Sequence, residues 1–470
     1  MKNLFILLLT ILLIPSCFKD SDINIDPNRS TVVDPSLLFA GSATQLSLLR
    51  VAELTWPVAL GGQMWSSGGR WGLGQSNYDQ TRIRSAWGRT YTDVLKNLYV
   101  AIDLIEKSPN PNKNSLAQCK ILAAFTYSQT TFLWGDIPFS EAAKGDVDFP
   151  KFDAQKDVLN GCIAMLDESI SSIDENGKGI QAPSDLYYAG NMSKWKKFAN
   201  SLKLRILFAM VDADPSKGAE ITKLMATNNF ISATSDVMEF KYYNQPGRQN
   251  PRFSFTAIFR GGVQTDWYCS KPVYDLQVTL NDPRIPYFYQ VGPDAAPGEF
   301  VALEAAETFT TKSALVSLNL LKADLPEVSF SYSEQLLFEA EAIARGFAPG
   351  GMSEATIRFR KGVEESAKSF GVPAAQATTY AASLPALTTS NFVKSLAEQQ
   401  YLDLFMRPVE GWVQNRRSGA VGNEIPKFKT PPAAPVAGFF RRILYRSEEI
   451  NSNPNTPSGL NIDTPMWFDK

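Results

Sequence analysis

The chain contains no histidine among its 470 residues. Ser-His-Asp and Cys-His catalysis both need an imidazole, so neither mechanism is open to this protein. The HExxH zinc hydrolases and other imidazole-ligated metal sites are excluded for the same reason. What remains is carboxylate chemistry of the glycosidase type, lysine chemistry, or no catalysis at all.

Cysteine is scarce as well, with Cys17, Cys119, Cys162 and Cys269 as the full set. Their spacing fits neither a zinc site nor a disulfide framework. Cys119 and Cys162 fall in helical patterns, where we expect them to pack as small core hydrophobes. No calcium-loop pattern is present either, so the sequence assigns no metal ligand and no cofactor.

The chain also lacks an excess of charge of one sign. It has 46 Lys and Arg against 48 Asp and Glu, a net charge of −2. No general basic field is therefore available to attract nucleic acid, and we expect no nucleic-acid partner. A hydrophobic fraction of 44% with 29 phenylalanines supports a sizeable core.

No apolar run is long enough to cross a bilayer, which takes about 20 residues. The run from Leu4 to Ile14, broken only by Thr10, instead fits the apolar region of an export signal. It ends in Ile-Pro-Ser-Cys, which resembles a bacterial lipobox. We therefore predict that residues 1–16 are a lipoprotein signal peptide and that Cys17 carries lipid. An ordinary secretory signal with an incidental cysteine is the alternative.

Residues 17–35 are mostly polar and contain two prolines, which predicts a tether. At about 150 residues per domain, the remainder would allow about three domains or one large solenoid-like unit. Apolar residues recur at helical spacing over much of it. We predict helices near residues 94–105, 116–133, 158–170, 193–212, 334–345, 354–370 and 391–412. Asp153 is expected to cap the third of these.

Paired helices of this length with short turns are typical of tetratricopeptide-like arrays, so we predict an all-α fold. Residues 36–470 are expected to form one helical domain. Two irregular stretches, near residues 56–80 and 240–330, are rich in Gly, Pro, Tyr and Phe. Long irregular segments in a compact protein are usually functional.

Several strings are similar to motifs of the SusD/RagB family. They are WGDIPFSEA at 134–142, FDAQ at 152–155, WKKFANSLKLR at 195–205, NDPR at 281–284, SEQLLFEAEA at 333–342, EGWVQNRRSG at 410–419 and RILY at 442–445. Each string alone is weak, but together they follow the family's order over nearly the whole chain. We expect most of these motif residues to stabilise the fold rather than to contact a ligand.

The resemblance implies a fold of tetratricopeptide-type helical pairs with an irregular face that binds ligand. It also implies a lipid-anchored protein on the extracellular face of the outer membrane, acting as a lid over a SusC-like TonB-dependent transporter. Its ligand would be an oligosaccharide, or alternatively a peptide. The resemblance implies no enzymatic activity.

Binding a sugar takes rigid aromatic platforms and planar polar groups. The first irregular stretch offers an exposed tryptophan in a glycine-rich loop. We therefore predict ligand contacts from both stretches: Trp65, Arg70, Trp71, Asn77, Tyr78, Tyr243, Asn250, Arg252, Trp267 and Tyr268. Alternatively, these aromatics fill the core beneath long loops. Trp134, Trp195 and Trp412 lie in helical or motif contexts and are expected in the core.

Two other functions remain open. A carboxylate-based glycoside hydrolase needs paired acids that flank a cleft, and no recognisable catalytic setting of that kind is present, so we assign no catalytic residue. A non-transport surface adhesin would lack a discrete ligand pocket and a transporter partner.

Overall fold

The computed structural model describes residues 33–68, 83–143, 147–256, 261, 263–305, 307–431, 436 and 438–469. The chain divides into two units, Met1–Asp34 and Pro35–Lys470, and every element below belongs to the second. Cys17 and the predicted signal peptide lie outside the described residues. No described helix has the length and apolar character that a bilayer span requires.

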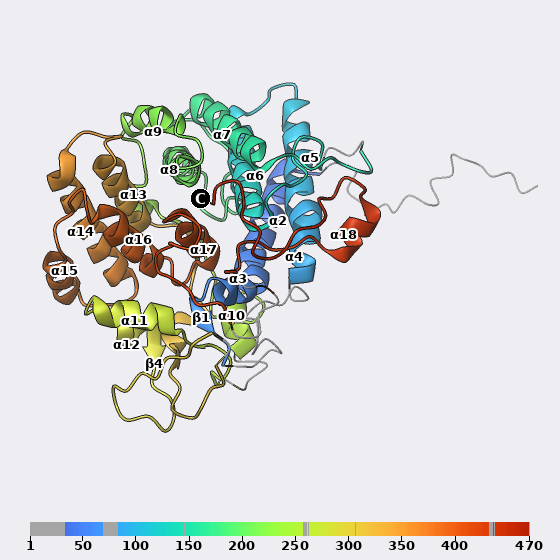
Figure 1. The fold of residues 1–470 in the computed structure, drawn as a ribbon. Helices are drawn as coiled ribbons and strands as arrows, with labels where there is room; N and C mark the ends of the chain where they lie inside the picture. Colours follow the sequence, from blue (N-terminus) through green and yellow to red (C-terminus); the bar gives the residue numbers. More distant parts are fainter. Residues whose placement is uncertain are drawn as a thin grey trace, which may run out of the picture. The chain divides into compact units, whose positions relative to one another are not determined.

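The N-terminal part of the second unit is a row of helices (Figure 1). Its elements are α2 (Pro35–Leu48), the π-helical η2 (Leu49–Leu54), α3 (Thr55–Gly61), α4 (Arg84–Arg89), the π-helical η4 (Thr90–Leu95), α5 (Lys96–Glu106), α6 (Lys113–Trp134), α7 (Gln155–Ser172), α8 (Met192–Met210) and α9 (Lys217–Met225). From α5 to α9, each helix packs on the next. Asn112 and Asn191 cap α6 and α8 through their side-chain oxygens.

A second group of helices follows nearer the C-terminus. It comprises α13 (Tyr332–Ala344), α14 (Gly351–Ser369), α15 (Ala374–Ser383), α16 (Phe392–Asp403), α17 (Pro408–Arg417) and the short α18 (Ser447–Ser452). Helix α13 packs on α14 and α16, and α17 contacts α3, α6 and α8. Figure 1 shows α17 between the two groups of helices. The predicted all-α fold of helical pairs is therefore confirmed.

Short strands and helices fill the stretch between the two groups. A four-stranded antiparallel sheet has the order β1 (Trp65–Ser66), β3 (Tyr268–Cys269), β5 (Leu315–Val316) and β4 (Tyr289–Gln290). A separate ribbon pairs β2 (Met238–Phe240) with β6 (Glu327–Phe330). The short helices are α10 (Pro251–Ser254), α11 (Lys271–Thr279), α12 (Ile285–Phe288), and the 3-10 turns η5 (Thr234–Asp236) and η7 (Leu318–Leu320).

Two helix predictions are wrong in detail. The expected helix 391–412 is interrupted, because Pro408 disfavours helical backbone at Arg407, whose φ and ψ are −124° and 67°. Asp153 does not cap α7, whose N-cap is Ala154. Its carboxylate instead accepts hydrogen bonds from the backbone N–H groups of Phe139 and Ser140, which fixes the preceding turn.

The expected core residues are confirmed. Trp134, Trp195 and Trp412 are buried, and so are Cys119 and Cys162. Burial raises the pKa of the Cys119 thiol to about 12, so this group stays protonated and unreactive at neutral pH. These residues belong to one large hydrophobic cluster that runs through the N-terminal helices.

Candidate functional site

An aromatic cluster surrounds the start of the four-stranded sheet. Trp65 lies on β1, which pairs with β3 and so brings Trp65 opposite Cys269. The rings of Trp56 and Trp267 stack with centroids 3.9 Å apart and planes 8° apart. The ring centroid of Trp65 lies 5.7 Å from that of Trp56 and 6.0 Å from that of Trp267. The ring centroid of Phe255 lies 5.7 Å from that of Trp56. Two predicted site residues, Trp65 and Trp267, are thereby brought together.

The expectation that Trp65 is exposed is wrong. Its side chain is 0% exposed and that of Trp267 is 2% exposed. Trp65 also packs against Phe405 of the loop after α16, 6.1 Å between centroids. Trp56, which the sequence reading missed, is only half-buried. It precedes Pro57 at the start of α3, and the only signal for it was its place at the edge of the glycine-rich stretch.

Gly68, two residues after the end of β1, occupies a backbone position that favours glycine. Its φ of 58° lies in the left-handed region, and an added Cβ would come within 2.8 Å of Phe309 and 2.9 Å of Tyr268. Tyr268, another predicted site residue, is itself buried and stacks on Phe309 at 5.1 Å. Close packing of two aromatic rings therefore explains this glycine.

The other predicted residues have different placements. Tyr243 is exposed, and the Arg248 guanidinium lies 4.1 Å from its ring centroid. Asn250 is fully buried and caps α10, since its side chain accepts from the Arg252 backbone N–H at 2.9 Å. Neither joins the aromatic cluster. Four further predictions lie outside the described residues: Arg70, Trp71, Asn77 and Tyr78.

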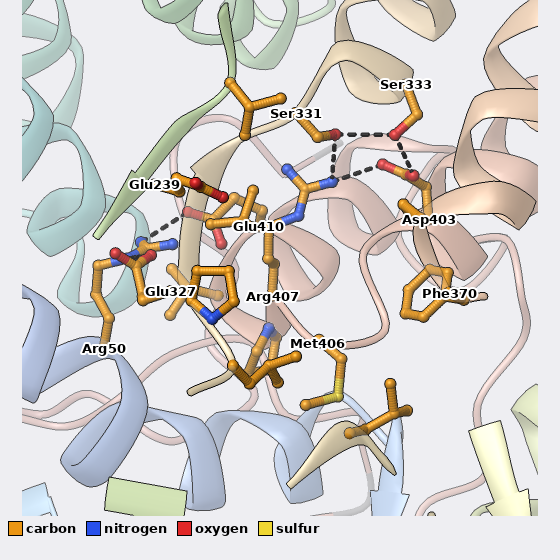
Figure 2. A pocket seen from close by; sticks show the side chains of 18 of the residues that line it. Arg50, Glu239, Glu327, Ser331, Ser333, Phe370, Asp403, Met406, Arg407 and Glu410 are labelled. Atoms are coloured by element: carbon orange, nitrogen blue, oxygen red, sulfur yellow. Dashed lines mark hydrogen bonds and ion pairs between the residues drawn. The ribbon is translucent and has the colours of Figure 1, made fainter. Parts of the chain in front are cut away.

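Arg252 lines a cleft of about 350 Å³ between the β2–β6 ribbon and the turn that joins α16 to α17 (Figure 2). Arg50 of η2 donates from Nε to Glu327 Oε1 at 2.7 Å and from Nη1 to Glu410 Oε1 at 2.8 Å. Arg407 donates to Asp403 at 2.6 Å and also to Glu334. The cleft therefore has a buried, ion-paired floor.

The electrostatics of this floor follow from burial and pairing. Burial would raise the pKa of Glu410, but Arg50 and Arg205 outweigh it and hold that pKa below its ordinary value. Burial lowers the pKa of Arg252 to about 10, although Glu327 acts in the opposite direction. Both groups are therefore charged at neutral pH. Within the described ranges, no group of three or more Cys, Asp or Glu is placed to hold a metal.

The sequence matches the family model for SusD-like proteins, described as starch-binding and associating with the outer membrane, over residues 27–433. The chain belongs to the SusD-like family. A search of curated proteins finds no significant match.

Several solved structures share the fold. A chitin-binding protein has a TM-score of 0.78 at 21% identity, over 93% of this chain and 100% of its own. A SusD-like protein from Bacteroidetes has a TM-score of 0.79 at 19% identity, with the same coverage of 93% and 100%. A chitin-binding SusD homolog from Flavobacterium johnsoniae has 0.73 at 17% identity, over 93% and 97%.

The SusD-like motif residues lie in the scaffold. Arg205 of α8 and Glu334 of α13 form a buried ion pair at 2.7 Å, and the Trp195 Nε1–H donates to Asp185 at 2.8 Å. Arg416 is fully buried and donates to the Phe132 carbonyl near the end of α6 at 2.8 Å. These motifs fix how the helices pack.

Proposed function

We propose that this protein is a lipid-anchored outer-membrane protein that captures oligosaccharides and delivers them to a SusC-like TonB-dependent transporter. The supporting observation is the match over residues 27–433 to a starch-binding family that associates with the outer membrane. Two proteins of the same fold are described as chitin-binding. Peptides are the alternative ligand. The extracellular face is where such a protein would meet its ligand.

We place the capture surface at the irregular face that carries the aromatic cluster. Trp56 is the half-buried tryptophan of that cluster, and its flat ring already stacks on Trp267 with centroids 3.9 Å apart. A braced ring loses little conformational freedom on binding, which favours stacking against the C–H face of a sugar. Arg70, Trp71, Asn77 and Tyr78 remain predicted ligand contacts of this face.

Binding rather than catalysis is favoured by the acids of the cleft. A glycoside hydrolase needs one carboxylate that is protonated and one that is free to act as base or nucleophile. Glu327 and Glu410 both accept hydrogen bonds from Arg50, and Asp403 accepts from Arg407. Despite burial, Arg50 and Arg205 hold the pKa of Glu410 below its ordinary value, so Glu410 is a poor proton donor. Glu239 also lines the cleft and burial raises its pKa, but Glu327, Glu410 and Asp403 are each held by an arginine, which disfavours a paired-acid mechanism.

The proposed function is tested by purification from gently solubilised outer membranes. We expect a large TonB-dependent barrel to co-purify, and the purified chain to bind chitin or starch oligosaccharides without shortening them. Repeated recovery of the chain alone would contradict the transporter partner and favour an adhesin. Shorter products after incubation would show a hydrolase, and binding of peptides only would shift the ligand class.

The lipid anchor gives a separate prediction, motivated by the Ile-Pro-Ser-Cys sequence that ends at Cys17. Mass spectrometry of the mature N-terminus should find Cys17 as the first residue and acylated. Each buried CH₂ contributes about 0.8 kcal/mol, so several acyl chains hold a protein firmly. Cys17→Ser should release the chain from the membrane fraction. An unmodified N-terminus at another residue would refute the anchor.

A further inference from the structure

A second cavity, of about 390 Å³, lies between α18, the helical segments α4 and η4, and the segment that follows α6 (Figure 1). We call it the α18 pocket. It shares no lining residue with the cleft between the β2–β6 ribbon and the α16–α17 turn. Trp87 and Tyr91 at its wall belong to the hydrophobic cluster of the N-terminal helices, whereas Trp65 and Trp267 belong to another cluster. The α18 pocket is therefore distinct from the cleft and from the aromatic face.

Three aromatic side chains line the α18 pocket: Trp87, Tyr91 and Phe149. Trp87 is 5% exposed and packs on Tyr91, with ring centroids 5.1 Å apart. The Tyr91 hydroxyl donates to the Pro138 carbonyl at 3.0 Å, which fixes the position of the ring. Tyr91 is half-buried and Phe149 is 54% exposed, so both present ring surface that a ligand can contact.

The lining of the pocket carries more negative than positive charge. The Trp87 Nε1–H donates to Glu449 Oε2 at 3.0 Å, which places this carboxylate against the aromatic wall. Glu449 is half-buried and Asp148 is exposed, and neither forms an ion pair within the described ranges. Arg446 is the one basic side chain among the described lining residues, and its Nη2 lies 3.3 Å from Glu448 Oε1. Two carboxylates therefore line the pocket without a counter-ion from the described residues.

Aromatic rings beside an unpaired carboxylate favour a cationic ligand. The face of a ring attracts positive charge, and Glu449 would be the counter-ion of an ammonium group held at that face. A neutral ligand would gain only the ring contact, and an anionic ligand would be repelled by both carboxylates.

The remaining lining suits a sugar ring. The hydroxyl groups of Thr92 and Ser452 line the pocket on exposed residues, so they can form hydrogen bonds with ligand hydroxyls. A volume of about 390 Å³ is near the lower end of the range for small-molecule sites. The pocket is therefore large enough for one or two sugar rings.

We propose that the α18 pocket binds an ammonium-bearing small molecule, namely an amino sugar in its charged form. The ammonium group donates to the Glu449 carboxylate and lies against the Tyr91 and Phe149 rings. The sugar hydroxyls bond to Thr92 and Ser452. This site depends neither on the transporter nor on oligosaccharide capture at the aromatic face.

Titration calorimetry on the purified chain at mildly acidic pH tests this pocket, with glucosamine, glucose and N-acetylglucosamine as probes. The three probes share a pyranose ring, but only glucosamine carries a charged amine. Glucosamine should bind at least tenfold more tightly than the other two. Glu449→Gln keeps an acceptor for Trp87 and removes the charge, so it should weaken glucosamine binding at least tenfold. Glu220→Gln, which makes the same change in the first turn of α9, should leave that affinity unchanged.

Ser452→Trp is a second variant, at an exposed position of α18, and it replaces Glu449→Gln if that variant does not fold. Its ring should occupy the pocket and weaken glucosamine binding at least tenfold. Ser171→Trp, at an exposed position near the end of α7, should have no such effect.

Three results would overturn the proposal: no binding of glucosamine, equally tight binding of glucose or N-acetylglucosamine, or glucosamine binding that survives both Glu449→Gln and Ser452→Trp. The last of these would place the amine at another site. None of the three bears on the capture of chitin or starch oligosaccharides, so the proposed function is tested separately.

Discussion

Glu334→Gln is expected to lower the free energy of unfolding by about 3–5 kcal/mol. Glu334 is 3% exposed and accepts hydrogen bonds from two arginines. Its Oε1 accepts from Arg205 Nε at 2.7 Å, while its Oε2 accepts from Arg205 Nη2 at 2.8 Å and from Arg407. Glutamine keeps the shape but removes the charge, so two buried guanidinium groups lose their shared counter-ion. Arg205 and Arg407 are both buried, so water cannot take the place of the lost counter-ion.

The matched control is Glu354→Gln. Glu354 lies in the first turn of α14 and accepts a hydrogen bond from Arg358 Nε at 2.9 Å, but Arg358 is exposed to solvent. Ion pairs of this kind contribute about 0.3–0.5 kcal/mol. Guanidinium unfolding of both variants, followed by circular dichroism, measures the difference. Similar small shifts in the two midpoints would mean that solvent reaches the Glu334 network and that its buried geometry is wrong.

The scaffold could be predicted from sequence because its determinants are local or tied to recognisable strings. The spacing of Val94, Leu98 and Ile102 puts them on one side of consecutive helical segments, and the structure buries all three. Arg205 and Glu334 each stand within a family motif, and the structure joins them. Motifs whose residues join helices therefore allow the fold to be predicted from sequence.

The cleft could not be predicted because no local pattern contains it. Arg50, Glu239, Arg252, Glu327 and Arg407 come from five different elements or turns and meet only in the folded chain. Within the sequence each is an isolated charge beside apolar residues. Of these five residues, the sequence singles out only Arg252, as a ligand contact of the stretch near residues 240–330, and the structure places it at the cleft.

The exposure of Trp65 was mispredicted for a related reason. Glycine-rich sequence around a tryptophan is compatible with an exposed loop and with a tightly packed turn. The deciding partners, Trp56, Trp267 and Phe405, are distant in sequence or belong to a segment that was expected to be irregular. Contacts with residues distant in sequence therefore decide whether Trp65 is buried, which local composition alone does not.

Trp65→Ala and Trp71→Ala should separate the core from the capture surface. Removing the fully buried Trp65 ring leaves a cavity against Trp56 and Trp267, which should cost about 3–5 kcal/mol of stability. Trp71 lies outside the described residues and remains a predicted ligand contact. A stacking tryptophan at the centre of a binding site contributes about 2 kcal/mol or more, so Trp71→Ala should weaken oligosaccharide binding at least tenfold.

Measuring melting temperature and oligosaccharide affinity on both variants decides between the two roles. We expect Trp65→Ala to melt well below the wild type, and Trp71→Ala to melt close to it with reduced affinity. Trp267→Ala is a second core variant, because the Trp267 ring stacks on Trp56 with centroids 3.9 Å apart and is 2% exposed. It should follow Trp65→Ala in stability. If Trp71→Ala instead lowers the melting temperature sharply and leaves affinity unchanged, Trp71 is a core residue and the capture surface must be built from other side chains.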